Sequence, residues 1–584
     1  MKCPQCGAEL RFDPATQLLV CDYCGGTQVP SLVQEQVSSA EEQVQDTDKS
    51  MAESAVSDHM ADVVTRDTSV STGVEDEGLR ESQEKIKALK TEDIKLVEYV
   101  CPNCGGTLYS VKESVNGFCS FCGSQVMLQS RFSSMKPPKG IIPFIKTKEE
   151  CKKIYSDLMK KNFFAPDELK DAEYLEQFRG IYMPYHVFNI DVNSNVEIKG
   201  TKSYRKGDYI YNEIYWGNAH LSAFYHGLSY DASSTFSDHF SEAIAPYDAH
   251  MIEPFDPDYL AGFYADMPDV SADCYSPDAT GFALDQIEPE LYQGWSGNIK
   301  WENVRGRIPL TPQNTKAYTA FFPVWFLSYK KKDRVAYAVI NGVNGKICCD
   351  TPVNTKKFIA CCFLLAIPIY IILAFIMPAL TPKTMISFIQ FFGCVCAALM
   401  LFNLGGIVKR EKHFDDRGYI YKFGGDKDKA AYAQTLKKEN KKNFFEKRMA
   451  SKSSSRGVLI AVLVYFSLHL YLPVLYGTVL MLQGGLIQPV IILVLSILMY
   501  VKGSSLKNRK ILLTGVTPLL AASWLSFIIT AIMPHSDPAF FASAAIIGTG
   551  VIIGLISVVE MQNLLNTRPL PQLSREGGDA SAPV

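Results

Sequence analysis

Eight of the sixteen cysteines in this 584-residue chain form four C-x-x-C pairs. The pairs occur in two sets, each with fourteen residues between its pairs, and the sets begin ninety-eight residues apart. Four thiolates satisfy the tetrahedral preference of Zn²⁺, and a C-x-x-C turn supplies two of them from one loop. We therefore expect two structural zinc sites, with one Zn²⁺ ion each. Their ligands are Cys3, Cys6, Cys21 and Cys24 in the first set and Cys101, Cys104, Cys119 and Cys122 in the second.

A glycine directly follows the second cysteine of every pair, at Gly7, Gly25, Gly105 and Gly123. Glycine tolerates positive φ, which lets the chain leave the ligand turn while backbone N–H groups face sulfur. The spacers contain β-prone pieces at 18–20 and 107–111. These features predict two zinc β-ribbons whose folding depends on the metal, because such units have little core. A redox C-x-x-C is the alternative, but it is expected beside a βαβ pattern, which the chain lacks.

The charge on the ribbons bears on their partners. Residues 1–26 contain only two basic residues, and residues 101–126 contain only Lys112. Nucleic-acid binding needs Lys and Arg side chains against phosphates. The sequence therefore favours protein partners on the cytoplasmic side, where reduced thiolates persist. Nucleic acid stays possible but disfavoured.

Composition divides the chain into further parts. Residues 1–29 and 98–134 are the two ribbons, and 30–97 reads as an acidic disordered linker with few aromatic residues. An amphipathic helix around 147–169, alternating apolar stretches and Asn-Gly turn signals predict that 135–356 is an α+β domain with an antiparallel sheet.

The segment 231–290 contains fourteen Asp and Glu residues, and there is no Lys or Arg from 207 to 299. An acidic solvated surface is the simpler interpretation, because no spacing matches an EF-hand loop, and a divalent-metal site stays open as the alternative. A P-loop, G-x-S-x-G and H-E-x-x-H are absent from the sequence. We therefore do not expect an enzyme.

Six apolar runs of roughly membrane-spanning length fill 357–566, and 567–584 reads as a disordered tail. They predict a six-helix all-α transmembrane bundle. The runs are 358–377, 385–408, 457–482, 485–501, 511–533 and 539–559.

Lys and Arg set the expected orientation. The connection 409–456 contains fifteen of them, whereas the three loops on the opposite side contain only Lys383. The positive-inside rule makes 409–456 a basic cytoplasmic loop and places both termini in the cytoplasm. The expected location is the bacterial inner membrane, as a multi-pass protein in contact with the lipid bilayer. His469, within the third run, leaves a transport role open.

Four stretches together resemble a known protein family. They are IIPF (141–144), GIYMPYHVFNIDV (180–192), EPFDPDYLAGF (253–263) and YTAFFPVWFLSYKKKDRVAYAVINGVNGK (318–346). With a preceding zinc ribbon, they resemble uncharacterised bacterial zinc-ribbon-containing membrane proteins, some of them labelled primosomal or helicase-like. The likeness covers roughly 100–356 and the membrane part, and the label implies a link to replication.

Three functions remain in view from the sequence. The first is a membrane-anchored zinc-ribbon protein that acts as a cytoplasmic docking or scaffold module for protein partners. The second is a nucleic-acid-associated factor that tethers replication or transcription machinery to the membrane. The third is a transporter regulated by its zinc domain.

Overall fold

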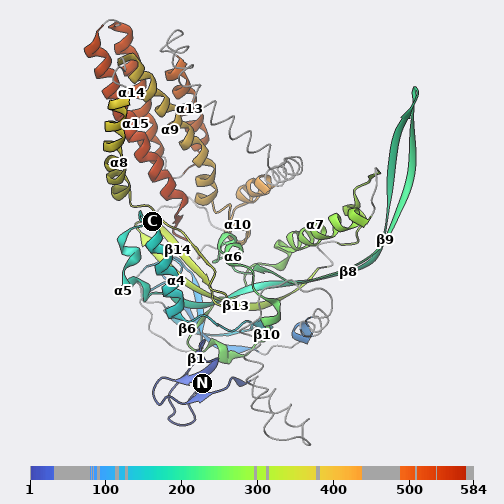
Figure 1. Ribbon diagram of the computed structural model, residues 1–584. Helices are drawn as coiled ribbons and strands as arrows, with labels where there is room; N and C mark the ends of the chain where they lie inside the picture. Colours follow the sequence, from blue (N-terminus) through green and yellow to red (C-terminus); the bar gives the residue numbers. More distant parts are fainter. Residues whose placement is uncertain are drawn as a thin grey trace, which may run out of the picture.

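The chain is described by a computed structural model, shown in Figure 1. The molecule is multidomain: an N-terminal ribbon lies at one end, a large sheet domain forms the middle, and apolar helices stand at the other end. The described residues are 2–31, 79, 82, 85–88, 93–111, 118–124, 129–294, 299–310, 315–376, 382–436, 487–504, 506, 510–533, 536–571 and 573.

The first ribbon is a small antiparallel sheet in the order β1-β2-β3. Its strands are β1 (Leu10–Asp13), β2 (Leu18–Cys21) and β3 (Thr27–Gln28). Alternation along β1 and β2 turns Phe12 and Leu19 to the same side, and both are fully buried. This buried side faces the sheet domain.

The middle domain is built on a thirteen-stranded, mainly antiparallel sheet, which confirms the predicted sheet type. Its centre is β8 (Arg179–Lys206), which pairs with β13 (Lys316–Lys331) on one side and forms a long hairpin with β9 (Tyr209–Asp231). The strand order is β10-β7-β13-β8-β11-β5-β4-β6. Shorter members are β7 (Gly140–Ile141), β10 (Glu253–Pro254), β11 (Tyr264–Ala265), β12 (Lys300–Trp301), β14 (Arg334–Asn341) and β15 (Ile347–Cys349).

The second ribbon is part of this same sheet. Its strands β4 (Ile94–Val100), β5 (Thr107–Ser110) and β6 (Gln129–Met135) pair antiparallel with one another. Strand β11 joins them to the rest, because it pairs with β5 and with β8. The boundary expected at residue 98 therefore falls inside β4, and this ribbon is continuous with the α+β domain.

Helices cover parts of the sheet. Helix α4 (Lys148–Lys161) begins with a capping box between Thr147 and Glu150, and it buries Cys151, Tyr155 and Met159. The others are α5 (Ala172–Leu175), α6 (Asp238–Ile244) and α7 (Ser276–Gly294), with 3-10 turns at Asp167–Lys170, Ala249–Met251, Pro257–Leu260, Ala272–Cys274 and Val304–Gly306.

Among the described residues, three helical segments are long and apolar enough to cross a membrane: Ile389–Glu411, Leu512–Ile532 and Asp537–Leu565. They belong to α9 (Pro382–Glu411), α14 (Lys510–Ile532) and α15 (Asp537–Leu565). Helices α8 (Thr355–Ile376) and α13 (Ile487–Gly503) coincide with two further predicted runs. The run 457–482, with His469, lies outside the described residues, so the six-helix bundle stays a prediction.

Two segments pack on the sheet domain beside these helices. Helix α10 (Arg417–Phe423) comes from the basic loop. Strand β16 (Arg568–Pro569) pairs with β14, so the tail expected to be disordered from residue 567 begins as an ordered strand. Two apolar residues of the tail, Leu570 and Leu573, pack against the core cluster that contains the second ribbon, which explains why this part of the tail is ordered.

Candidate metal centres

The structure brings all eight cysteines of the sequence prediction together as two four-cysteine groups. Within each group the sulfur atoms lie within 4.8 Å of one another. The Cys3–Cys24 and Cys6–Cys21 Sγ distances are 3.5 and 3.4 Å. In the second group, Cys101–Cys122 and Cys104–Cys119 are both 3.8 Å apart. Zn–S bonds of about 2.3 Å place tetrahedral sulfurs about 3.8 Å apart, so each group can hold a metal ion of this kind.

The backbone around the sulfurs has the expected turn geometry. Gly7, Gly25, Gly105 and Gly123 have φ of 73°, 74°, 74° and 66°. In each turn the glycine N–H donates to the carbonyl of the first cysteine, as in Gly105 N to Cys101 O at 2.8 Å. Positive φ at these positions was predicted from the sequence, and it is confirmed.

The crowded thiols of the second group compete for protons. Hydrogen bonding with Cys104 lowers the pKa of the Cys101 thiol to about 7, and the same contact raises the pKa of the Cys104 thiol. Four crowded thiols therefore cannot all ionise by themselves. A metal ion supplies the positive charge that lets all four sulfurs bind as thiolates.

The first ribbon is held on the sheet domain by its inner face. The Phe12 N–H donates to Ala261 O at 2.9 Å, and the Phe12 ring contacts Tyr259 with centroids 5.0 Å apart. At the far end of the hairpin, Gln17 Nε2 donates to Phe144 O at 2.8 Å. The residues at the metal end, 4–7 and 22–25, stay exposed. The ribbon is therefore fixed with its metal-binding loops directed away from the domain.

The second ribbon is enclosed. All four of its cysteines are buried, whereas Cys6 and Cys24 in the first ribbon are exposed. Lys330 Nζ donates to Ser124 Oγ at 2.7 Å, and the Tyr337 hydroxyl donates to Phe121 O. From the other side, Leu573 N donates to Cys104 O at 2.6 Å. Strands β13 and β14 and the C-terminal tail thus hold this metal site inside the molecule.

One position distinguishes the two ribbons. Tyr23 stands between Asp22 and Cys24 just as Phe121 stands between Ser120 and Cys122. Phe121 is 2% exposed and contacts Phe326 with ring centroids 6.4 Å apart, whereas Tyr23 is 85% exposed. The same aromatic position is therefore buried by the chain itself in one ribbon and left open in the other.

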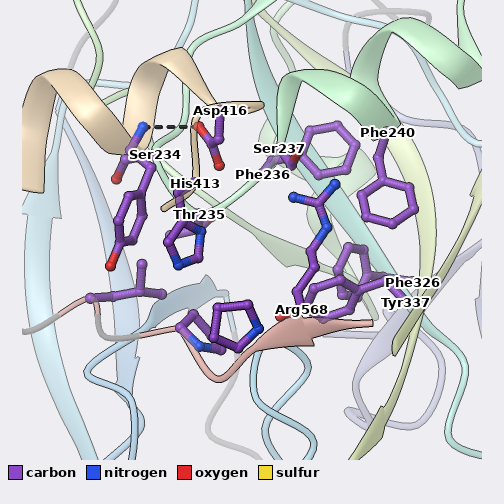
Figure 2. A pocket seen from close by; sticks show the side chains of 14 residues that line it. Ser234, Thr235, Phe236, Ser237, Phe240, Phe326, Tyr337, His413, Asp416 and Arg568 are labelled. Atoms are coloured by element: carbon purple, nitrogen blue, oxygen red, sulfur yellow. Dashed lines mark hydrogen bonds between the residues drawn. The ribbon is translucent and has the colours of Figure 1, made fainter. Parts of the chain in front are cut away.

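A pocket lies where the tail crosses the domain, between Ser234–Ser237, α10 and β16 (Figure 2). In it, Asp416 accepts from Tyr419 N at 2.9 Å, and the Arg568 guanidinium lies over the Phe240 ring, 5.0 Å from its centroid. Burial lowers the pKa of His413 to about 4, so this side chain is neutral at physiological pH. The pocket volume of about 30 Å³ has room for about two water molecules. It is a joint between segments and too small for an organic ligand.

The basic loop supplies partners for the acidic segment 231–290. Arg417 pairs with Asp278 and donates to Cys274 O at 2.8 Å, and its guanidinium lies 5.1 Å from the Tyr275 ring centroid. Lys422 pairs with Asp269. The sequence showed both charge patterns, but their separation along the chain concealed that they meet. The metal groups found among the described residues are the two cysteine sets, so the divalent site at 231–290 stays a prediction.

Comparisons with known proteins give a relationship without an activity. No protein-family model matches the chain, and no solved structure matches it. The chain is similar to a protein of Bacillus subtilis (strain 168) named Uncharacterized protein YdjG. The two are 26% identical over 324 residues, covering 45% of this chain and 93% of the relative. That name carries no activity, and the link to replication expected from the family resemblance stays a prediction.

Proposed function

We propose that this chain is a membrane-anchored docking protein whose first zinc ribbon binds a protein partner on the cytoplasmic side. The observation that carries the proposal is the exposed Tyr23 at the metal end of a ribbon that is otherwise fixed to the domain. A rigidly held apolar residue in an exposed loop costs little entropy to bury in an interface. Aromatic residues of this kind are frequent binding hot spots.

The second ribbon indicates how such a partner would bind. Phe121 packs against Phe326 of β13 in the core cluster on which Leu573 of the tail also packs, while the Leu573 N–H donates to the carbonyl of the metal-binding Cys104. We infer that the first ribbon receives an extended apolar segment of a partner in the same manner, against Tyr23 and the Cys6 carbonyl. In this scheme both ions are Zn²⁺; the second ribbon is structural and the first is the docking site.

Charge supports the placement at the bacterial inner membrane with both termini in the cytoplasm. The connection 409–456 contains fifteen Lys and Arg residues and the tail contains Arg568 and Arg575, as expected for cytoplasmic segments. Both pack on the same sheet domain, α10 through Arg417 and β16 through its pairing with β14. These contacts favour one side of the membrane for the domain, the loop and the tail.

Site-specific crosslinking in cells tests the docking role. A photo-crosslinking amino acid in place of Tyr23 should give one adduct of discrete mass, and the adduct should disappear when Cys3→Ser removes a metal ligand. The matched control is Ala15, which is exposed at the other end of the same hairpin. Equal adducts at positions 15 and 23, or none at 23, would refute the proposal.

The nucleic-acid alternative has its own test on the purified full chain in detergent. Residues 1–26 contain two basic side chains, Lys2 and Arg11, against three acidic ones, which leaves little positive charge to meet phosphates. We expect no rise in fluorescence anisotropy of labelled DNA or RNA even at low salt, where phosphate attraction is strongest. Tight binding with a steep salt dependence would replace the protein-docking role.

A further inference from the structure

The hairpin β8–β9 extends well beyond the body of the molecule. Its base is supported by α7, through buried contacts of Phe188, Ile190 and Ile198 with Ala283 and other residues of that helix. Beyond Thr201 on β8, where the pairing with β12 ends, and before Gly217 on β9, the side chains are exposed. Five residues of β8, 202–206, continue past this support, about 17 Å at a strand rise of about 3.3 Å per residue.

The distal part of the hairpin is rich in exposed aromatic and aliphatic residues. Tyr209 is 73% exposed, Ile210 71% and Trp216 64%. Tyr204 and Tyr211 are directly paired across the strands and their rings stack with centroids 5.6 Å apart. A two-stranded ribbon with no third strand is only marginally stable in water. We therefore expect that another surface buries these exposed side chains and stabilises the distal hairpin.

Both faces of the hairpin carry such residues. The pairing register places Tyr204, Tyr209, Tyr211 and Tyr215 on one face, since paired residues and alternate residues share a face. The opposite face carries Ile210, Ile214 and Trp216. A partner that packs on one face would leave the other face exposed. A surface that the hairpin enters tip first covers both.

Basic residues accompany the aromatic ones. Lys199, Lys202, Arg205 and Lys206 lie on β8, and the distal segment 199–217 has two acidic residues, Asp208 and Glu213, for a net charge of +2. Arg205 and Asp208 are 3.9 Å apart and largely exposed, so the cation remains available to another anion. Tyr, Trp, Lys and Arg together are the residues that anchor proteins at the headgroup level of a bilayer.

The shape of the molecule brings this tip to the membrane side. In Figure 1 the hairpin leaves the sheet domain sideways and then bends toward the side on which α9, α14 and α15 stand. We propose that the tip of β8–β9 enters the headgroup region of the same bilayer that holds these helices, and that anionic phospholipid strengthens the contact. Among the described residues, the outer edges of the hairpin have no strand partner beyond Thr201, so their backbone N–H and C=O groups keep the tip out of the hydrocarbon core.

Tryptophan quenching in lipid nanodiscs tests the contact with the full chain. Tyr209→Trp places a reporter at the tip, and lipids brominated near the headgroup should quench it strongly in discs of phosphatidylcholine with phosphatidylglycerol. The matched control is Tyr23→Trp, at a tyrosine that is also largely exposed (85%, against 73% for Tyr209) on the ribbon at the opposite end of the molecule, and it should show no added quenching. Adding Lys202→Glu and Lys206→Glu to Tyr209→Trp should reduce the quenching by at least half.

Trp524 in α14 separates the failure of this proposal from the failure of the membrane assignment. Lipids brominated near the chain ends should quench a component that Trp524→Phe removes. If Trp524 is quenched while Tyr209→Trp behaves like Tyr23→Trp, the hairpin does not touch the bilayer and the proposal is wrong. Equal quenching of Tyr209→Trp with and without phosphatidylglycerol would overturn the role of anionic lipid. If a photo-crosslinking amino acid in place of Tyr209 gave adducts between two copies of the chain, and Tyr209→Trp showed no quenching, the partner of the hairpin would be a second chain instead.

Discussion

Glu411, the last residue of α9, forms an ion pair with Arg334, the first residue of β14. The two side chains are only 11% and 17% exposed. Arg334 also donates to the carbonyls of Leu564 at 2.9 Å and Thr567 at 2.8 Å, at the end of α15. Arg334 of the sheet domain therefore links the ends of α9 and α15 to β14. A displacement of either helix end would move β14 and, with it, the sheet that carries the second ribbon.

Removing this cation should weaken the joint. Arg334→Met leaves Glu411 without its partner in a largely buried position, and the free energy of unfolding should fall by about 2 to 3 kcal/mol. Denaturant unfolding of the full chain in detergent, followed by intrinsic fluorescence, measures the loss. Adding Glu411→Leu should recover part of it, because an apolar pair needs no desolvation of charge.

Arg205→Met is the matched control, because Arg205 and Asp208 form an exposed pair at 3.9 Å on the distal hairpin. Its effect on the free energy of unfolding should stay within about 0.5 kcal/mol. Similar losses for the two substitutions would mean that the Arg334 contacts do not join the helices to the sheet.

Metal content and release should differ between the ribbons. We expect two Zn²⁺ ions per chain and two phases of release to a coloured chelator. The fast phase should come from the first ribbon, because Cys6 and Cys24 are exposed, and the slow phase from the enclosed second ribbon. Cys6→Ser should remove the fast phase alone, and Cys104→Ser the slow one together with much of the domain's stability. A single phase in the unaltered chain would contradict this order.

The cysteine spacing predicted both metal groups and their glycine turns, because these features depend on neighbours a few residues apart. Whether the rest of the chain covers each ribbon or leaves it exposed could not be predicted from such local patterns. Strand β11, only two residues long, joins the second ribbon to the sheet, and Tyr23 and Phe121 look alike in sequence. What differs is whether a distant segment covers them, and such pairings are set by tertiary packing and not by local pattern.

The tail is the clearest case of such a distant partner, and shortening it should expose the second metal site. A chain that ends after Thr567 lacks the pairing of β16 with β14 and the bond from Leu573 N to Cys104 O. Losing the partly buried Leu573 and this bond costs about 1.4 kcal/mol or more, so the slow phase of zinc release should become about tenfold faster. A chain that ends after Leu573 is the control and should release zinc at the original rate. Unchanged release from the shorter chain would show that the tail does not protect the site.

A buried carboxyl in the domain should make stability depend on pH. Asp266 accepts from Ser233 Oγ and Thr235 Oγ1, both at 2.5 Å, and burial, followed by the nearby charge of Asp269, raises the pKa of Asp266 to about 7. Between about pH 4 and pH 7 the folded state therefore binds more protons at this group than the unfolded state does. This group makes the free energy of unfolding fall as pH rises through that window, by on the order of 4 kcal/mol at most.

Replacing the carboxyl tests the sign of this effect. Asp266→Asn cannot ionise, so its melting temperature relative to the unaltered chain should improve steadily from about pH 5 to about pH 7.5. Comparing two chains at the same pH cancels the loss of zinc at low pH, which acts in the opposite direction by protonating thiolates. Asp157→Asn is the control, because Asp157 is exposed and its contact with Lys160 lowers the pKa of that carboxyl, so no such improvement should appear. If Asp266→Asn and Asp157→Asn follow the same pH profile, then Asp266 is ionised in the folded protein at neutral pH and its two hydroxyl donors are enough to offset its burial.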